Sequence, residues 1–153
     1  WDLVDWIVIT SQAPKPVGSS DGHRLAATSP LQAARVADTP RRLNLCRQAI
    51  LGRDFAALAR IVEQDSNLMH AVMLSSQPAL MYWQPETVTL MQAIRGWREQ
   101  GLSVCYSIDA GPNVHCLCLG EQAEQVGREL ESLVPEARLI RSGAGGPARL
   151  VGA

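Results

Sequence analysis

The residue best placed to do chemistry is Asp109, which stands between an apolar run and a tight turn. In that run apolar side chains alternate with small or polar ones, at Leu102, Val104, Tyr106 and Ile108. The alternation has the period of a half-buried strand, and Gly111 and Pro112 end the strand abruptly. A carboxylate held at a strand end, beside a glycine that lets a ligand approach the main chain, suits a catalytic base. The same spacing fits an Asx turn, in which the Asp109 side chain caps the amides that follow, and spacing alone favours that turn.

Residues 15–23 form a polar segment that is suited to hold an anion. Ser19 and Ser20 supply hydroxyls, the small residues and a following helix start present backbone amides, and Lys15 adds a point charge. A cluster of Ser, Gly and Pro is also the ordinary composition of a surface loop, so this segment alone does not identify a phosphate site.

A second polar group lies inside an apolar helical pattern, at Asp65, Ser66, Asn67 and His70. Asn67 and His70 are three residues apart and share a helix face, whereas Asp65 and His70 lie on adjacent faces. A histidine in this setting is more often a hydrogen-bonded core group than a ligand or a base. The other histidines, His23 and His115, do not complete a close ligand motif, so no metal site is expected.

Composition favours one domain and excludes several classes of partner. With 153 residues, 46% of them hydrophobic, the chain is long enough to bury one substantial core. The net charge of -1 and the pI near 6.3 give no electrostatic reason to expect nucleic acid or an anionic membrane as a partner. No apolar run approaches the roughly 20 residues that span a bilayer, and no secretory signal is visible, so a cytoplasmic protein is expected.

The first part of the chain has the pattern of one strand followed by helices. An apolar, β-rich run predicts a strand over residues 3–9, and the Pro-, Gly- and Ser-rich residues 11–22 predict a loop. Proline follows a helix-capping residue twice, after Ser29 and after Thr39, so two short helices are expected to start there. The second of them is expected to end at Gly52.

The remaining pattern completes an α+β domain. Asp54 is expected to cap a longer helix that runs to about residue 75, and a further helix is expected between Pro85 and Gly101. The last elements are expected to be strands at 102–109 and 114–119, a helix at 121–134 and a strand at 138–141. This order predicts a ferredoxin-like split βαβ fold, with an antiparallel sheet, helices on one face and a helical insert after the first strand.

Taken in order, these segments resemble the C-terminal domain of the diphosphomevalonate and phosphomevalonate decarboxylases, in the GHMP kinase superfamily. The family's pattern of a lysine, a valine, paired serines and Gly-Met is matched at Lys15, Val17, Ser19, Gly22 and His23. Its Asp-Ser-Asn-x-x-His-Ala helix is matched at residues 65–71, and its Asp-Ala-Gly-Pro-Asn turn at residues 109–113. The resemblance implies that residues 1–153 are one GHMP kinase C-terminal-type domain, and that the N-terminal nucleotide-binding domain is absent from this chain.

The resemblance also implies a reaction, the ATP-dependent decarboxylation of 5-diphosphomevalonate to isopentenyl diphosphate with ATP and Mg²⁺ as cofactors. In the family the aspartate that matches Asp109 faces the 3-hydroxyl of the substrate, so Asp109 is the expected catalytic residue. The expected substrate-binding residues are Lys15, Ser19, Ser20, Asn67 and His70. Phosphorylation turns the tertiary hydroxyl into a leaving group, and its departure leaves an electron-poor carbon that drives loss of carbon dioxide. Mg²⁺ is expected to be bound mostly through ATP phosphates.

Departures from the family pattern keep alternatives open. Gly18 replaces the first serine of the pair, Ser20 stands where some members have arginine or threonine, and His23 replaces methionine. Fewer cationic and hydroxyl donors fit a substrate with one phosphate, so a phosphomevalonate decarboxylase giving isopentenyl phosphate is an alternative. A different GHMP-type kinase and a non-catalytic ferredoxin-like binding module are two others. The turn at residues 109–113 favours decarboxylation over phosphorylation alone.

The expected partners follow from the same resemblance. The superfamily places its nucleotide loop and the arginine for the substrate carboxylate in the N-terminal half, and neither occurs in this chain. We therefore expect a phosphorylated mevalonate as the small-molecule partner and the chain's own N-terminal domain as the protein partner. Residues 1–153 alone are expected to be inactive, and an exposed domain interface could make them form a homodimer.

Overall fold

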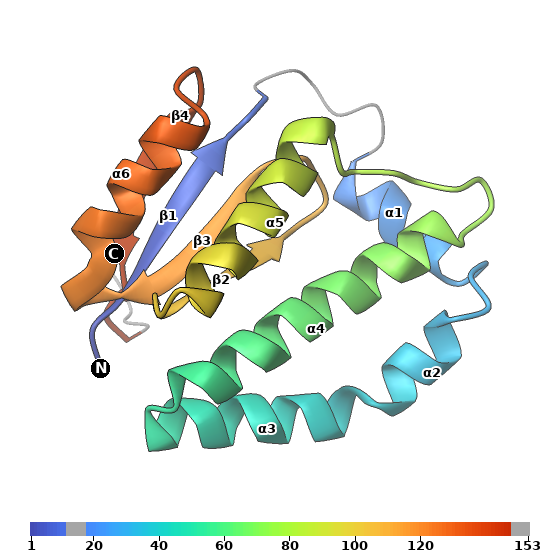
Figure 1. Cartoon of the computed structure of the whole chain (residues 1–153). Coiled ribbons are helices and arrows are strands. Elements are labelled where there is room, and N and C mark those ends of the chain that lie inside the picture. The colour runs from blue at the N-terminus through green and yellow to red at the C-terminus, as the bar shows by residue number, and fades with distance from the viewer. Residues whose placement is uncertain (12–17, 148–153) are drawn as a thin grey trace, which may run out of the picture.

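A four-stranded antiparallel sheet organises the protein (Figure 1). The structure, a computed structural model, describes residues 1–11 and 18–147. The strands are β1 (Leu3–Ile9), β2 (Val104–Ile108), β3 (Val114–Leu119) and β4 (Arg138–Gly143). Their order in the sheet is β2-β3-β1-β4, and every neighbouring pair is antiparallel. The predicted ferredoxin-like arrangement is thus confirmed.

Six helices in the described part of the chain connect and cover these strands. Between β1 and β2 lie α1 (Ser19–Ala26), α2 (Gln32–Ala37), α3 (Thr39–Gly52), α4 (Phe55–Leu74) and α5 (Pro85–Glu99). A short 3-10 turn leads from β3 into α6 (Ala123–Leu133). Helices α5 and α6 cover one face of the sheet, α4 runs beside the edge strand β2, and α3 packs along α4 (Figure 1).

The main core lies between the sheet and the helices α5 and α6. Because strand residues alternate between faces, one set of side chains on each strand is buried there. This set includes Val4, Val8, Val104, Tyr106, Ile108, Val114, Cys116 and Cys118, which pack against Leu90, Ile94, Val126 and Leu130. The alternate residues, such as Ile7 and Leu117, are half-buried on the opposite face.

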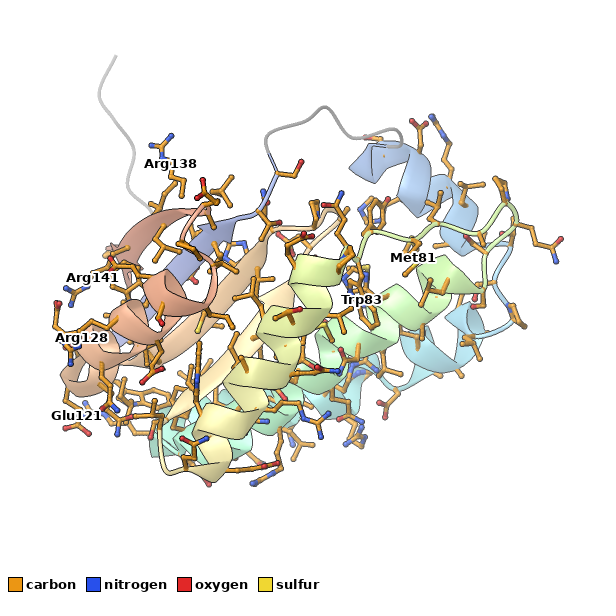
Figure 2. All side chains as sticks on the ribbon, turned by 45° about the horizontal axis from the view of Figure 1, so that its top comes forward. Met81, Trp83, Glu121, Arg128, Arg138 and Arg141 are labelled. Carbon is orange, nitrogen blue, oxygen red and sulfur yellow. The ribbon has the colours of Figure 1, made fainter. Side chains whose placement is uncertain are left out.

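Trp6 on β1 shows how closely α6 approaches the sheet. Its indole Nε1 donates a hydrogen bond to the carbonyl of Ala123, 3.0 Å away. A Cβ atom on Gly127 would lie only 2.8 Å from the Trp6 ring, so glycine is needed at this helix position. Arg141 lies over the same ring, 5.8 Å from its centroid, and Figure 2 shows it with Arg128 on the side of α6 and β4. These contacts fix one end of the sheet.

Several predicted boundaries hold because local signals set them. The Asp54 side chain accepts a hydrogen bond from the amide of Ala57 at 2.9 Å, so it caps α4 as predicted. Helix α4 ends at Leu74, and α5 begins at Pro85. The glycine after α5, Gly101, has a φ of +102°, a conformation that ends a helix readily.

Other boundaries differ from the prediction. Residues 19–26 form helix α1, although a loop was expected as far as residue 22, because Ala26 packs against Val72 and Met73 of α4. The helix expected after Ser29 begins at Gln32 instead, since the Ser29 hydroxyl and carbonyl accept hydrogen bonds that form a turn. Helix α3 has 14 residues and is therefore not short.

Two further observations concern membranes and thiols. No helix in the described part of the chain is long and apolar enough to cross a membrane. All four cysteines are free thiols, and burial raises the pKa of Cys105 to about 12 and that of Cys118 to about 11. Buried thiols with such pKa values stay protonated and unreactive near neutral pH.

Candidate active site

Asp109 directly follows the last residue of β2 and begins the turn to β3. Its side chain is exposed, and none of the described residues donates a hydrogen bond to its carboxylate. The turn is closed by the main chain instead, because the Gly111 amide donates to the Asp109 carbonyl at 2.8 Å. The alternative of an Asx turn held by the side chain is therefore not what the structure shows. The carboxylate is available to a ligand.

The residue before it, Ile108, is held by side chains of α4. Strand β2 lies at the edge of the sheet, so its outward N–H and C=O groups have no strand partner. The Ile108 amide donates to the Ser66 hydroxyl at 3.0 Å, and that hydroxyl donates to the Ile108 carbonyl at 3.2 Å. Nε2 of His70 lies 3.0 Å from the same carbonyl oxygen. A carbonyl only accepts, so Nε2 of His70 carries the proton in this bond.

The His70 ring is itself fixed by its surroundings. It is 1% exposed and packs against Trp83, with ring centroids 5.0 Å apart, and edge-on against Tyr82 at 6.1 Å. Burial lowers the pKa of His70, although the Ile108 carbonyl and the charge of Asp109 act in the opposite direction. His70 is therefore a rigid, neutral donor at neutral pH.

The other end of the turn is held from α5 and from the end of β1. The carbonyl of Pro112 accepts hydrogen bonds from the hydroxyls of Thr87 at 2.8 Å and Thr10 at 3.2 Å. The side-chain oxygen of Asn113 accepts from the amides of Thr10 at 3.1 Å and Ser11 at 3.3 Å. The turn thus joins three elements that are distant in sequence.

The charge of Asp109 also acts on a second histidine, His115, which lies on β3 at the open face of the sheet. Nδ1 of His115 lies 2.8 Å from a carboxylate oxygen of Asp5 on β1. This hydrogen bond raises the pKa of His115, burial opposes it, and the charges of Asp5 and Asp109 add to the rise. The pKa values of the two histidines next to the turn, His70 and His115, are therefore shifted in opposite directions.

A pocket of about 140 Å³ lies between the turn and the helices α1, α2 and α4. Its wall includes Ala110 of the turn, Gly22 and His23 of α1, and Arg35 of α2. The hydroxyl of Tyr82, which also lines it, and Nε of Arg35 are buried without a hydrogen-bond partner in the described part of the chain. The pocket thus lies between Ala110, the residue after the catalytic candidate, and the middle of α1.

The chain matches a known protein family over most of its length. Residues 6–147 match the mevalonate 5-diphosphate decarboxylase C-terminal domain family. The chain belongs to this family. Its relatives are decarboxylases, and the family's expected turn and helix are the elements that meet at Asp109 in the structure.

Two relatives and one solved structure show how far this decarboxylase likeness extends. The diphosphomevalonate decarboxylase of Aspergillus fumigatus is 33% identical over 132 residues, which is 84% of this chain and 33% of the relative. The phosphomevalonate decarboxylase of Haloferax volcanii is 28% identical over 152 residues, 98% of this chain and 46% of the relative. A structure of MDDEF in complex with MVAPP, AMPPCP and magnesium has a TM-score of 0.87 at 27% identity, covering 95% of this chain and 44% of that one. The chain spans a third to a half of the length of these proteins.

In this domain the predicted residues Asn67 and His70 both face β2. The Asn67 amide bonds the hydroxyl of Tyr106, 3.1 Å from Nδ2, while His70 bonds the Ile108 carbonyl. His70 therefore contacts the residue directly before Asp109, and Asn67 contacts Tyr106, three residues before it. Their binding of substrate remains a prediction.

Two of the predicted anion-binding residues begin α1, the helix whose Gly22 and His23 line the pocket. Ser19 and Ser20 are the first two residues of α1, whose N-cap residue, Gly18, has no side chain that could cap the first amides. The first amides of a helix have no partner within the helix and attract anions. Lys15 lies outside the described residues.

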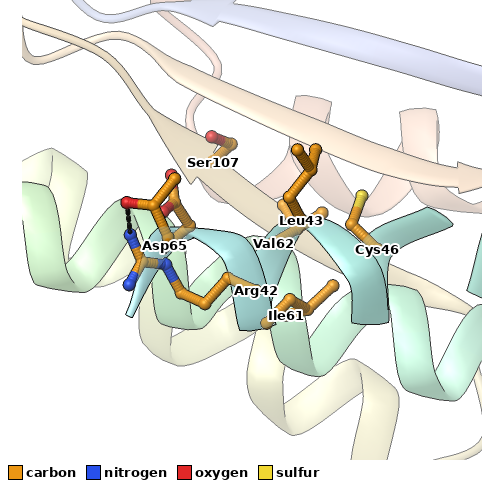
Figure 3. A pocket seen from close by; sticks show the side chains of 8 residues that line it. Arg42, Leu43, Cys46, Ile61, Val62, Asp65 and Ser107 are labelled. Atoms are coloured by element: carbon orange, nitrogen blue, oxygen red, sulfur yellow. Dashed lines mark hydrogen bonds and ion pairs between the residues drawn. The ribbon is translucent and has the colours of Figure 1, made fainter. Parts of the chain in front are cut away.

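A larger pocket, of about 330 Å³, is separate from this site (Figure 3). It lies between α3, α4 and β2, and Asp65 of the family's helix motif is on its wall. Asp65 accepts a hydrogen bond from Nε of the buried Arg42 at 2.8 Å, so it links α4 to α3. Among residues 1–11 and 18–147, no three His, Cys, Asp or Glu side chains lie close enough to hold a metal ion.

Sequence reasoning did not identify several residues that build the site. Ser66 and Asn113 lie within the family motifs, yet their bonds to the main chain were not predicted. Thr87 and Tyr82 stand in unremarkable sequence, and no local pattern marks either of them. Their roles depend on contacts with residues far away in the chain.

Proposed function

We propose that this chain is the C-terminal domain of an enzyme that decarboxylates a phosphorylated mevalonate in an ATP-dependent reaction. One observation carries the proposal: the Asp109 carboxylate is exposed and free of hydrogen bonds to the described residues, while the main chain on both sides of it is fixed. A carboxylate without a structural task, held on a rigid main chain beside Ala110, which lines the smaller pocket, suits a catalytic group.

The role of Asp109 follows from the charge that develops on the substrate. The carboxylate accepts or holds the proton of the 3-hydroxyl, which makes that oxygen the better nucleophile. ATP with Mg²⁺ would supply the phosphoryl group, with Mg²⁺ bound mostly through the nucleotide phosphates. Once the carboxylate has passed this proton to solvent, its restored negative charge stabilises the electron-poor carbon that forms as the phosphorylated oxygen leaves, until carbon dioxide departs.

The start of α1 would hold the 5-phosphate end of the substrate. Its free amides, the hydroxyls of Ser19 and Ser20, and Lys15 are the donors that this chain offers. The substrate could carry one phosphate or two at this end, because a phosphomevalonate decarboxylase and a diphosphomevalonate decarboxylase both match this chain. The neighbour's complex with AMPPCP and magnesium supports a nucleotide as the second substrate.

The proposal is tested with the full-length protein that carries this chain. Mevalonate with one or with two phosphates at C5 is incubated with ATP and Mg²⁺, and ADP and carbon dioxide are measured together. We expect equal amounts of both products from one of the two substrates. ADP without carbon dioxide would identify a kinase, and neither product from either substrate would refute the proposal.

Partners are proposed on the same basis. Because this chain covers 33% and 46% of two relatives, the rest of the longer protein is the proposed protein partner, with a second copy of this chain as the alternative. Since the chain covers less than half of its relatives, residues 1–153 alone should release no carbon dioxide. Steady-state turnover by this chain alone would contradict that expectation.

A further inference from the structure

We propose that Ser66 and His70 are positioning residues that orient the Asp109 carboxylate by holding the main chain of Ile108. The inference rests on the proposed function, in which Asp109 acts on the substrate hydroxyl. It adds a role for two buried α4 residues that do not need to touch the substrate.

The first step is the geometry of one peptide plane. The carbonyl oxygen of Ile108 and the Cα atom of Asp109 belong to the same planar peptide unit. Two side chains bond that oxygen, Nε2 of His70 at 3.0 Å and the Ser66 hydroxyl at 3.2 Å. Fixing the oxygen therefore fixes the plane from which the Asp109 side chain departs.

The second step is that in the described structure no side chain bonds the carboxylate itself. No described residue bonds the Asp109 side chain, and the turn's own bond reaches only its backbone carbonyl, from the Gly111 amide at 2.8 Å. The direction of the carboxylate thus depends on its backbone. A misplacement of about 1 Å at a reacting group lowers the rate by roughly 100-fold.

The third step is that the two α4 residues are themselves rigid. Ser66 and His70 are four residues apart and so share one face of the helix, and both are buried. His70 is held between α4 and the ring of Trp83. Because both side chains are rigid, they hold the Ile108 carbonyl in one place, which mobile exposed side chains would not do.

The same helix provides a matched control. One turn before Ser66, Glu63 accepts a hydrogen bond from the Tyr106 amide at 3.4 Å and pairs with Arg98, whose Nη2 lies 2.9 Å from Oε2. It therefore holds the same edge strand, but two residues farther from Asp109. A purely structural role for these α4 contacts would make loss of Glu63 and loss of His70 equivalent for catalysis.

The experiment compares variants of the full-length enzyme. His70→Phe keeps a ring but removes the donor, and we expect kcat about 10-fold to 100-fold lower with KM for both substrates within about twofold. His70→Gln restores a donor near the position of Nε2 and should recover most of kcat. Glu63→Met should lower the melting temperature and leave kcat unchanged. Equal losses of kcat in His70→Phe and Glu63→Met, or no loss in His70→Phe, would overturn the inference.

Two further measurements separate this inference from the proposed function. If His70→Phe does not fold, Ser66→Ala takes its place, with faster hydrogen exchange at the Ile108 amide and a smaller loss of kcat expected. If the wild-type enzyme releases no carbon dioxide, the proposed function fails alone. Hydrogen exchange over residues 108–113 then decides the positioning: it should rise in His70→Phe and Ser66→Ala and not in Glu63→Met, and equal exchange in all variants would refute it.

Discussion

The two ends of the candidate site are built differently. At the Asp109 end, buried side chains from α4 and α5 bond the main chain on both sides of the catalytic candidate. At the α1 end, the helix has no side-chain cap, α2 has no buried residue, and Tyr82 and Arg35 each bury a polar atom without a partner in the described structure. The first end is preorganised for chemistry, and the second leaves donors free for a ligand. Preorganisation favours the transition state, whereas free donors favour binding.

The largest effect that this comparison predicts is on Asp109 itself. Asp109→Asn removes the charge and the proton acceptor but keeps the shape, so kcat should fall by about 100-fold to 10,000-fold with little change in KM. Because the side chain is exposed and makes no bond to a described residue, the free energy of unfolding should change by less than about 0.5 kcal/mol. Product release and a thermal melt measure the two quantities.

A matched control for that variant is Glu121→Gln. Glu121 is an exposed carboxylate at the other end of the molecule from Trp83, as Figure 2 shows, and its loss should leave kcat unchanged. Turnover of Asp109→Asn equal to that of the control would remove Asp109 from the mechanism and favour the binding-module alternative.

The next effect concerns the α5 side of the turn. Thr87 is completely buried, and its hydroxyl both donates to the Pro112 carbonyl and accepts from the Gln84 amide at 3.2 Å. Thr87→Val keeps the shape but leaves a buried group unpaired, which should cost about 1 to 3 kcal/mol of stability. Since the turn loosens, kcat should also fall, by about 3-fold to 10-fold.

Thr89 supplies the comparison for this variant on the same helix. Its hydroxyl donates only to the Pro85 carbonyl one turn earlier, and the residue is exposed. Thr89→Val should change stability by less than about 0.5 kcal/mol and leave kcat alone. Chemical denaturation of the two variants side by side checks this, and a Thr87→Val protein as stable as Thr89→Val would show that the buried bond contributes nothing.

These threonines also show where prediction from sequence ends. Strands β2 and β3 and the place of Asp109 could be predicted because alternation and the Gly-Pro turn are local signals. The hydroxyls that bond Pro112 come from residues 25 and 102 positions away, so no local pattern could reveal them. The same limit explains α1, whose Ser- and Gly-rich sequence is typical of a loop until Ala26 packs against α4.

For His70, the sequence predicted the kind of role but not the bonding partner. The sequence indicated that a histidine inside an apolar helix is usually a hydrogen-bonded core group, and burial and the bond to Ile108 agree with that. Which group it would bond could not be predicted, because that depends on how α4 lies along the edge of the sheet. The proposed positioning role would therefore add to this core role of His70 without replacing it.

A smaller effect is expected at the α1 end. A Cβ atom on Gly22 would lie 2.8 Å from the Tyr82 hydroxyl, at the wall of the smaller pocket. Gly22→Ala should therefore push that ring aside and raise KM for the phosphorylated substrate, by about 3-fold to 10-fold, with kcat unchanged. Gly96→Ala is the control, since nothing lies within 4 Å of the added atom. A fall in kcat without a change in KM would mean that the two ends do not divide the work as proposed.

The smallest expected effect is on the pH dependence of stability. The charge of Asp109 acts on both His70 and His115, yet the pKa of His70 is lowered and that of His115 is raised. The raised pKa of His115 means that its pair with Asp5 stabilises the fold below about pH 6.5, and that this contribution is lost as pH rises through the raised value. The lowered pKa of His70 has the opposite effect on stability. As pH drops below about 6.5, this histidine binds a proton in the unfolded chain but not yet in the folded protein, so the free energy of unfolding falls. Asp5→Asn should return the pKa of His115 towards its ordinary value and remove about 0.5 to 1 kcal/mol at low pH only. NMR titration of the two rings measures both pKa values. A His115 pKa in Asp5→Asn equal to that of the wild-type protein would mean that the pair does not form in solution.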